Sequence, residues 1–386
     1  MRENLAMDPE SLEQALPLLG GLSPAQFMRR HWQKKPLLVR QAWPGLTPPL
    51  ARAPLFDLAG QPGVESRLVQ HTATGWQLRH GPLPRRALPP VARPNWTLLV
   101  QGLDLHVPAA HAMLAAFNFL PHARLDDLMV SWASDGGGVG PHLDSYDVFL
   151  LQVQGRRRWR VGRAPDRTLV DGLPLKILQH FEPEFDWVLE PGDMLYLPPL
   201  WGHDGVAQGE CMTASIGFRA PGRRELAREL LLRVADAHAE ADVADPLYAD
   251  RDQAAVATPG RVPAAYAPFA ADAVRRALAT PAALERALGE WLTEPKPQVW
   301  FDPAEATPGR SAGLRLDARS RMLYDDHHVF MNGESWRASG RDARLLQRLA
   351  DQRRLSAADR AGLSAGASAI VDDWLDDGWV HEEADR

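Results

Sequence analysis

The segment from residue 125 to 220 constrains the fold most, because short apolar stretches alternate there with glycine and proline turns. Many short strands separated by turns are typical of a β-sandwich or a β-barrel. The strands expected from this pattern are Leu128–Ala133, Val148–Gln154, Arg157–Val161, Trp187–Leu189, Met194–Leu197 and Met212–Phe218. The sequence therefore predicts a mainly β core in the middle of the chain.

The regions on either side of this segment follow other patterns. Ser23 and Pro24 form an N-cap followed by proline, which predicts a helix over 25–32, and a strand is expected at 37–39. The proline-rich stretch that follows suggests three strands and one helix, at Leu68–Gln70, Trp76–Arg79, Thr97–Val100 and Pro108–Leu120. After residue 220, helices are expected at Arg223–Ala239 and Ala282–Leu292.

The last ninety or so residues mix short strands with helices and predict a small winged-helix-like domain. The strands expected there are Gln298–Phe301, Arg321–Tyr324 and His328–Met331, and the helices are Ala343–Asp351 and Ala367–Asp377. Since Pro295-Lys296-Pro297 marks a boundary, we expect a β-rich domain over 1–220, a helical segment over 221–297 and the winged-helix-like domain over 298–386.

Composition and charge narrow the class of protein. No apolar run reaches the ~20 residues that a membrane-spanning helix needs, the N-terminus lacks the apolar core of a signal peptide, and the single Cys211 excludes an intramolecular disulfide. These features predict a cytoplasmic protein with no membrane partner. The net charge of −6 argues against nucleic acid as the main ligand and fits a basic protein partner, although the charge also serves solubility.

His142 and Asp144 are the first two candidate metal ligands. They follow the glycine-rich run 136–140, and residues two apart in a strand project to the same face, so both side chains can reach one metal ion. His203, which follows an apolar strand and the Pro198-Pro199 bend, is the best third ligand. Two histidines and one carboxylate form the facial triad of non-heme Fe(II) oxygenases, which leaves coordination positions open.

These segments also have alternative interpretations. An isolated His-x-Asp is common and usually binds no metal. A second cluster, Asp325-Asp326-His327-His328, reads as a turn in the small C-terminal domain. The glycine-rich run lacks the Gly-Lys-Ser/Thr ending of a phosphate-binding loop, so the P-loop is rejected.

An arginine suited to bind a carboxylate lies on the strand expected at 157–161. Arg157 shares one face with Trp159 and Val161, which should be the inner face, so Arg157 is expected to point inward. A planar guanidinium binds a carboxylate through two hydrogen bonds, as the distal carboxylate of 2-oxoglutarate would require. The alternative is that the arginines of 156–160 form a basic surface stripe.

These motifs resemble those of bacterial ribosomal oxygenases of the Jumonji-C (cupin) type. The resemblance is carried by five stretches: 138–152 with His142 and Asp144, 155–162, 189–199, 215–221 and, near the N-terminus, Phe27 with 31–37. It covers residues 20–220 strongly, and beyond 220 it rests on a helical segment followed by a winged-helix-like end. It implies a double-stranded β-helix (jelly-roll) oxygenase domain over 1–220, dimerisation through 221–297, and a winged helix over 298–386.

The resemblance also implies an activity and roles for individual residues. Family members look like dioxygenases that use Fe(II), 2-oxoglutarate and O2 to hydroxylate Cβ of an arginine in a basic protein, large-subunit ribosomal protein sixteen. Carried over by motif, His142, Asp144 and His203 match the iron ligands, and Arg157 and Ser131 match residues that bind 2-oxoglutarate.

Strand parity adds candidates for the substrate pocket. They are Asp127 and Met129, which share a face with Ser131, Tyr146, which shares a face with His142 and Asp144, and the pair Thr213 and Ser215. An acid and an aromatic ring suit a guanidinium through charge pairing and cation–π contact. The alternative is that Met129 and Tyr146 are core residues.

Two other functions stay open at this point. A cupin domain joined to a winged helix can act as a ligand-sensing regulator without catalysis, since a fold does not fix a function. Within the enzyme class, the target residue could be a histidine of another ribosomal protein. The acid at Asp127 favours arginine.

Overall fold

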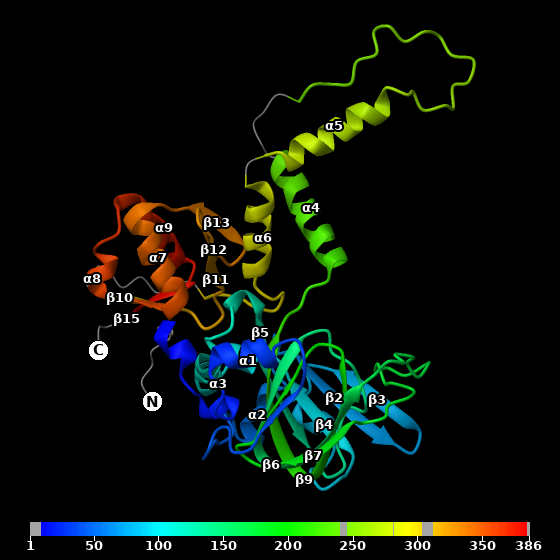
Figure 1. Ribbon diagram of the computed structural model, residues 1–386, viewed down its shortest axis with the longest axis vertical. Coiled ribbons are helices and arrows are strands. Elements are labelled where there is room, and N and C mark those ends of the chain that lie inside the picture. The colour runs from blue at the N-terminus through cyan, green and yellow to red at the C-terminus, as the bar shows by residue number, and fades with distance from the viewer. Residues whose placement is uncertain (1–8, 240–244, 281, 303–311, 384–386) are drawn as a thin grey trace. The chain divides into compact units, whose positions relative to one another are not determined.

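The computed structural model describes residues 9–239, 245–280, 282–302 and 312–383. Contacts between residues group the chain into two compact units (Figure 1). The first comprises Met1–Ala220, Lys296–Ser320 and Asp351–Arg386, and the second comprises Pro221–Pro295 and Arg321–Ala350. The division of the chain into three domains at 220 and 297 stays a prediction.

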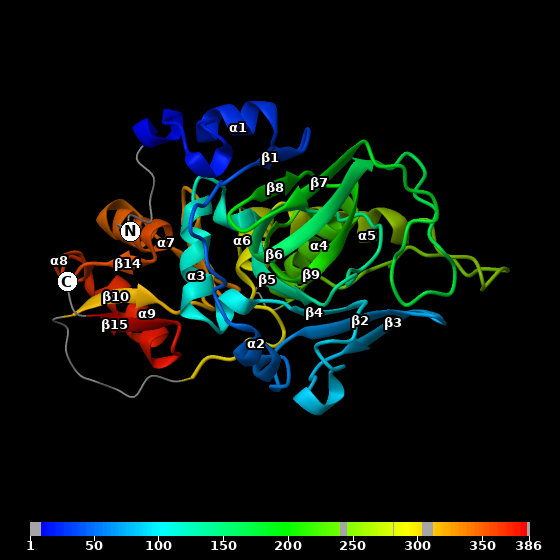
Figure 2. The same cartoon turned by 90° about the horizontal axis from the view of Figure 1, so that it is seen from below.

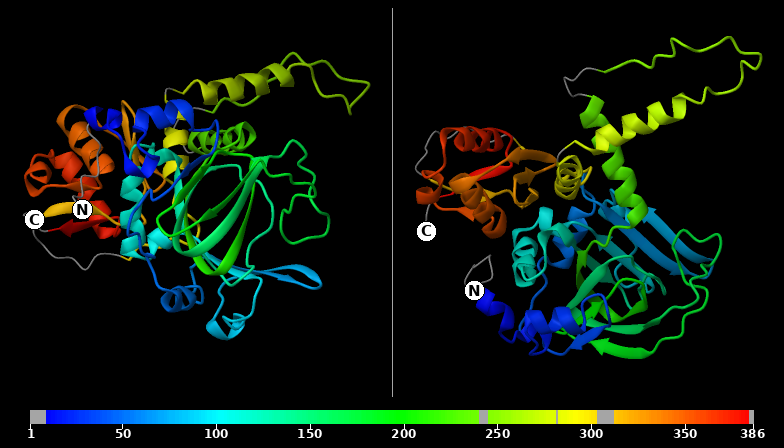
Figure 3. Two further views of the ribbon diagram at one scale, coloured as in Figure 1. Left: turned by 60° about the horizontal axis from the view of Figure 1, so that its bottom comes forward. Right: turned by 45° about the horizontal axis from the view of Figure 1, so that its top comes forward.

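The first unit is built on one large antiparallel sheet. Its strands are β1 (Leu37–Val39), β2 (Ser66–Thr72), β3 (Gly75–His80), β4 (Trp96–Val100), β5 (Leu125–Ala133), β6 (Asp147–Arg163), β7 (Phe185–Leu189), β8 (Met194–Leu197) and β9 (Trp201–Phe218). They lie in the order β1-β8-β6-β9-β5-β4-β2-β3, and β7 also pairs with β6. In both views of Figure 3 the cyan-to-green strands curve around a common interior.

Strands β6 and β9 form the centre of this sheet and pair along almost their whole length, from Asp147↔Phe218 to Arg163↔Trp201. Two register irregularities, at 152–154 and 154–156, bend the pair, as β-bulges do. The first half of β6 then pairs with β8 and the second half with β7. The two strands expected at 148–154 and 157–161 are therefore two halves of one bent strand (Figure 2).

Short helices close one face of the sheet and complete the core. They are α1 (Pro24–Arg30), α2 (Arg52–Leu58) and α3 (Pro108–Leu114), with 3-10 turns at Pro9–Glu13, Pro17–Leu19, Arg85–Ala87, Leu103–Leu105, Ala115–Phe117 and His122–Arg124. Phe27 of α1 and Phe56 of α2 are buried with Trp132 and Phe149 in one hydrophobic cluster. Burial of these aromatic side chains stabilises the fold, at roughly 25 cal/mol per Å² of apolar surface removed from water.

The helix α1 begins as the sequence predicts. Ser23 caps it, and the side chain of Gln26 reaches back to the Ser23 backbone N–H, which completes a capping box around Pro24. The helix expected over 108–120 is shorter than predicted, because α3 ends at Leu114 and a 3-10 turn follows it.

The first unit also holds a small sheet with strand order β14-β10-β15, formed by β10 (Gly313–Leu316), β14 (Arg354–Leu355) and β15 (Val380–Glu383). The helices α8 (Ala357–Arg360) and α9 (Ala365–Asp376) accompany it. The strand expected at Gln298–Phe301 is wrong, since Gln298 lies in a turn and the residues after it belong to no helix or strand.

The second unit is mainly helical. It contains α4 (Arg223–Ala239), α5 (Tyr266–Leu278), α6 (Ala283–Thr293), most of α7 (Gly340–Gln352) and a sheet of β11 (Met322–Tyr324), β12 (His328–Met331) and β13 (Glu334–Arg337). The helix α5 was not predicted. Among the described residues, no helix has the length and apolar character that crossing a lipid bilayer requires.

Candidate functional site

His142 and His203 face each other across a single antiparallel bridge. The His142 N–H donates to the carbonyl of His203 at 3.0 Å, and the His203 N–H donates to the carbonyl of His142 at 3.1 Å. His203 is the third residue of β9, whereas His142 lies in the loop between β5 and β6. This reciprocal pairing fixes the separation of the two imidazoles through the backbone.

The expectation that His142 and Asp144 lie on one strand is wrong. Only His142 pairs, and Asp144 lies in the loop, where its carbonyl accepts the N–H of Leu200 at 2.8 Å. On the N-terminal side of the bridge, Gly140 has a φ of +78° and Pro141 has no N–H to donate to a ladder, so the pairing does not extend beyond His142. The loop nevertheless turns both side chains toward His203.

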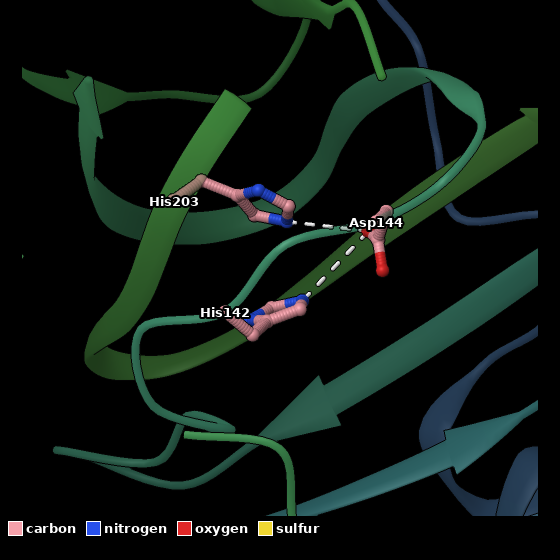
Figure 4. A group of neighbouring side chains, drawn as sticks. All are labelled: His142, Asp144 and His203. Atoms are coloured by element: carbon pink, nitrogen blue, oxygen red, sulfur yellow. Dashed lines mark ion pairs between the residues drawn. The ribbon is translucent and has the colours of Figure 1, made fainter. Parts of the chain in front are cut away.

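The two histidines and Asp144 bring three ligand atoms within 4.8 Å of one another (Figure 4). The Asp144 Oδ2 lies 3.4 Å from the His203 Nε2 and 3.8 Å from the His142 Nε2. Ligands at about 2.0–2.2 Å from one metal, on adjacent corners of an octahedron, lie roughly 3 Å apart. The arrangement therefore fits a metal ion with three protein ligands on one face.

Backbone carbonyls orient both imidazoles. The Nδ1 of His142 lies 2.9 Å from the Gly140 carbonyl, and the Nδ1 of His203 lies 3.0 Å from the Trp201 carbonyl. Because a carbonyl oxygen only accepts, each Nδ1 must donate its proton. Each Nε2 is then directed toward Asp144. Burial lowers the pKa of His203, but its hydrogen bond to Asp144 raises it overall, so a metal ion would displace the proton on the His203 Nε2.

The charges at this site also suit a cation. Burial raises the pKa of Asp144, but the hydrogen bond and charge of His203 and the charge of His142 outweigh it and lower the pKa to about 2. Burial and the neighbouring His203 lower the pKa of His142. The carboxylate is therefore ionised and the His142 imidazole neutral near pH 7, which are the protonation states in which both side chains bind metals.

Arg157 points into the interior of the first unit and presents unpaired donors. It is 4% exposed, and its Nη1 donates to the Oγ of Ser131 at 2.9 Å. Within the part of the chain that the structure describes, its Nε and Nη2 are buried with no hydrogen-bond partner. A buried guanidinium edge left with two free donors is costly unless a ligand accepts from both, and a carboxylate fits that edge.

Trp159 lies between the arginine and the metal ligands, a role that the sequence does not predict. Its ring centroid is 5.8 Å from the Arg157 Cζ and 6.0 Å from the His203 ring. A side-chain carbon on its cross-strand neighbour Gly205 would lie 2.6 Å from the indole, so glycine is required there. The signal that could have identified Trp159 was its shared face with Arg157.

The structure brings several candidate pocket residues near these groups. On β5 and β9, Ser131 is directly opposite Thr213, and Met129 is opposite Ser215. Thr213 is fully buried and donates to Gln152 at 2.9 Å. The side chain of Tyr146 donates a hydrogen bond to the Asp144 carboxylate. Burial, and secondly the charge of Asp144, raise the pKa of the Tyr146 phenol.

Asp127 has a partner that sequence reasoning did not anticipate. Its Oδ2 accepts from the Nζ of Lys296 at 2.7 Å and from the N–H of Gly102 at 3.1 Å, and Lys296 also lies 3.2 Å from Asp126. These groups border a cavity of about 210 Å³ whose lining includes Asp127, Lys296 and His106 but none of the three candidate metal ligands. Asp127 therefore does not contact the metal site itself.

Asp104 lies next to this acid cluster and makes stability depend on pH. Its burial, and secondly the charge of Asp127, raise its pKa from an ordinary value near 3.8 to about 7. The folded chain binds this proton more tightly than the unfolded chain, so the contribution to stability is full below about pH 4 and is lost as the pH rises to about 7.

Asp104→Asn should therefore melt at a higher temperature than the wild type at pH 8, with a smaller difference at pH 5. An equal difference at both pH values, or the same trend in the exposed control Asp171→Asn, would contradict this account.

Comparisons with known proteins agree with the fold. Residues 112–226 match the JmjC domain family, and residues 275–381 match the ROXA-like winged helix family. The ribosomal protein uL16 3-hydroxylase of Escherichia coli is 36% identical over 332 residues, covering 80% of this chain and 84% of that protein. A probable ribosomal oxygenase of Haemophilus influenzae is 36% identical over 210 residues, covering 53% of this chain and 52% of that one.

Solved structures give the same result. The X-ray structure of E. coli YcfD has a TM-score of 0.81 at 32% identity and covers 93% of this chain and 98% of that chain. A structure of the E. coli ribosomal oxygenase YcfD in complex with cobalt and 2-oxoglutarate has a TM-score of 0.78 at 32% identity, over 94% and 99% of the two chains. The expected fold class is confirmed: a JmjC double-stranded β-helix with a C-terminal winged helix.

Proposed function

This chain belongs to the JmjC ribosomal oxygenases, and we propose from that premise that it hydroxylates Cβ of an arginine in ribosomal protein uL16. It is a 2-oxoglutarate-dependent dioxygenase that uses Fe(II), with 2-oxoglutarate and O2 as cosubstrates. The observation that carries the assignment is the convergence of His142, Asp144 and His203 beside a buried arginine with two free donors. The target protein is proposed from the name of the E. coli relative.

The iron would be held by His142, Asp144 and His203. When bound, it supplies the oxidative chemistry that converts 2-oxoglutarate and O2 to succinate and CO2 and places one oxygen atom in a C–H bond of the substrate. The three side chains occupy one face of the metal and leave the other positions to the cosubstrates. The carbonyls of Gly140 and Trp201 keep each Nε2 directed at the ion.

Arg157 and Ser131 would bind 2-oxoglutarate. The Nε and Nη2 of Arg157 donate to the distal carboxylate, while Nη1 stays on Ser131 and keeps the guanidinium in its plane. Trp159 fills the space between this arginine and His203 and excludes water from it. The cosubstrate is thereby oriented before the reaction begins.

Tyr146, Met129, Asp127, Thr213 and Ser215 would form the substrate pocket. Tyr146 supplies an aromatic face beside Asp144. Burial and the charge of Asp144 raise its pKa, and the charges of Asp127 and Asp126 raise it further, so these three carboxylates lie within electrostatic reach of the phenol. An aromatic face near carboxylates suits a guanidinium. Lys296 already neutralises one charge of the Asp126–Asp127 pair, so the pair retains one negative charge for one substrate cation.

The proposed partners are a basic ribosomal protein and a second copy of this chain. In the second unit, α4 and α5 expose large apolar side chains, among them Leu231 at 48%, Leu232 at 49% and Val274 at 59%, and α5 has no buried residue. Large apolar side chains exposed in such numbers on neighbouring helices favour an interface. We place the reaction in the cytoplasm, where ribosomal proteins are made, and propose no nucleic-acid ligand.

The activity is tested by turnover. The full chain, reconstituted anaerobically with Fe(II), should form succinate from 2-oxoglutarate faster when uL16 is added, and uL16 should gain the mass of one oxygen atom on an arginine. The same assay with the target arginine replaced by lysine should lose the stimulation. A gain of oxygen on a histidine of another ribosomal protein would support the alternative target, and DNA binding without succinate would support a regulator.

A further inference from the structure

The backbone just ahead of His142 is enclosed by two side chains from distant parts of the first unit. Gly140 is buried, and a side-chain carbon there would lie 2.5 Å from the Cδ1 of Ile177 and 3.0 Å from the Cζ2 of Trp76. Trp76 comes from the β2–β3 hairpin, and Ile177 from the connection between β6 and β7. The two side chains therefore contact the glycine so closely that no larger residue fits.

This contact falls on the atoms that orient a candidate metal ligand. The Gly140 carbonyl accepts the Nδ1 proton of His142 at 2.9 Å. The next carbonyl, that of Pro141, accepts the N–H of Leu178 at 2.8 Å. The backbone between 140 and 142 is thus held by packing, by a hydrogen bond to the 164–184 connection and by the bridge to His203.

Both enclosing side chains are themselves held in place. Trp76 is directly opposite His71 on the hairpin, and the two rings stack with centroids 4.4 Å apart and planes 19° apart. Ile177 is 5% exposed, and its carbonyl accepts the N–H of Val170 at 2.9 Å beside the bridge of Leu169 with Leu178. A held side chain can transmit its position to the backbone that it contacts, because packed interiors yield little.

We propose that Trp76 and Ile177 are positioning residues for the metal site, which press the Gly140 carbonyl into the place where it orients the His142 imidazole. This inference rests on the proposed role of His142 as a metal ligand. Partners that orient a ligating histidine typically change metal affinity 10–100-fold when they are lost. Trp76 acts on His142 only through the Gly140 carbonyl, so we expect its loss to lower metal affinity by about tenfold, the lower end of that range.

The test is a titration of the full-length chain with Co(II), followed by its visible absorption. Trp76→Ala should bind Co(II) roughly tenfold more weakly than the wild type and should shift the ligand-field bands, because the imidazole is less well oriented. Trp76→Phe should show the same defect, since phenylalanine keeps an aromatic ring against His71 but is too short to replace the indole Cζ2. Ile177→Ala should also weaken Co(II) binding, because it removes the second side chain that packs against Gly140.

Controls separate positioning from folding. Trp300→Ala removes a tryptophan that is 76% exposed and should bind Co(II) as the wild type does. Melting temperatures of the metal-free variants show whether each variant is folded at the temperature of the titration. If Trp76→Ala does not fold, the milder single variants Trp76→Phe and Ile177→Val test the positioning role. Wild-type affinity and spectrum in either Trp76 variant would overturn the proposal.

The same titration distinguishes this proposal from the proposed function. The wild-type chain should bind one Co(II), and His142→Ala should not. Failure of the wild type to bind, or full binding by His142→Ala, would remove the metal assignment and the positioning role together. Binding that depends on His142 but not on Trp76 would remove the positioning role alone.

Discussion

Replacing His142 by alanine is expected to abolish iron retention and succinate formation. The variant keeps Asp144 and His203, but it loses one of the three atoms that lie within 4.8 Å of one another. Two protein ligands do not hold a divalent ion against water as three do, and even the loss of a group that only orients a ligand costs about 10–100-fold. We therefore expect turnover to fall by at least roughly 100-fold.

The measurement is the metal content of the full chain after reconstitution and desalting, together with succinate formed from 2-oxoglutarate. His80→Ala is the matched control, because His80 is an exposed histidine on β3 and should keep both metal and turnover. Retention of one iron per chain and wild-type succinate production by His142→Ala would refute the metal assignment. The fold itself should persist, since the bridge to His203 is made by backbone atoms.

The residue types of the site could be predicted from the sequence, but the local structure that presents them could not. His142, Asp144 and His203 were chosen for their chemistry and spacing, and the structure brings them together. The strand geometry expected for the first two is wrong, because His142 makes a single isolated bridge and Asp144 lies in the loop after it. A facial metal site needs only convergence of ligand atoms, which a loop can supply as well as a strand.

Parity succeeded where the strand is long and one of its faces is buried. In the second half of β6, Arg157, Trp159 and Val161 are buried while Arg156, Arg158 and Arg160 are exposed, as the period of two predicts. The exposed arginines are not a free basic stripe, since Arg158 pairs with Asp186 and Arg160 with Asp204. Alternation predicts which side chains are buried only where one face of the strand is buried, because a shift of one residue would then bury the charged side chains.

Contacts between distant parts of the chain had no signal in the sequence. The ion pair of Asp127 with Lys296 joins residues 169 positions apart, and nothing in either local segment indicates the other. The enclosure of Gly140 by Trp76 and Ile177 is of the same kind. The small sheet of β10, β14 and β15 also pairs strands from separated segments, and each of these is too short to stand out by pattern.

Arg157→Ala is expected to raise the KM for 2-oxoglutarate by roughly 30-fold or more and to change kcat much less. Removing one partner of a buried, hydrogen-bonded charge pair costs about 2–5 kcal/mol, and each 1.36 kcal/mol is a factor of ten. In the proposed role, Arg157 binds the distal carboxylate and not the reacting carbon, so its interaction should be lost equally from the bound cosubstrate and from the transition state. The substitution should therefore raise the KM for 2-oxoglutarate and leave kcat nearly unchanged.

Further variants at and around Arg157 make this prediction specific. Arg157→Lys keeps a positive charge but loses the planar pair of donors at Nε and Nη2, so its KM should lie between those of the wild type and Arg157→Ala. Arg158→Ala removes the next arginine, which faces outward and pairs with Asp186 at the surface, and its KM should equal that of the wild type. Ser131→Ala should raise the KM modestly, because it frees Nη1 without removing the charge. An unchanged KM in Arg157→Ala, measured by initial rates of succinate formation across a range of 2-oxoglutarate concentrations, would place the carboxylate site elsewhere and leave the free donors of Arg157 without a ligand.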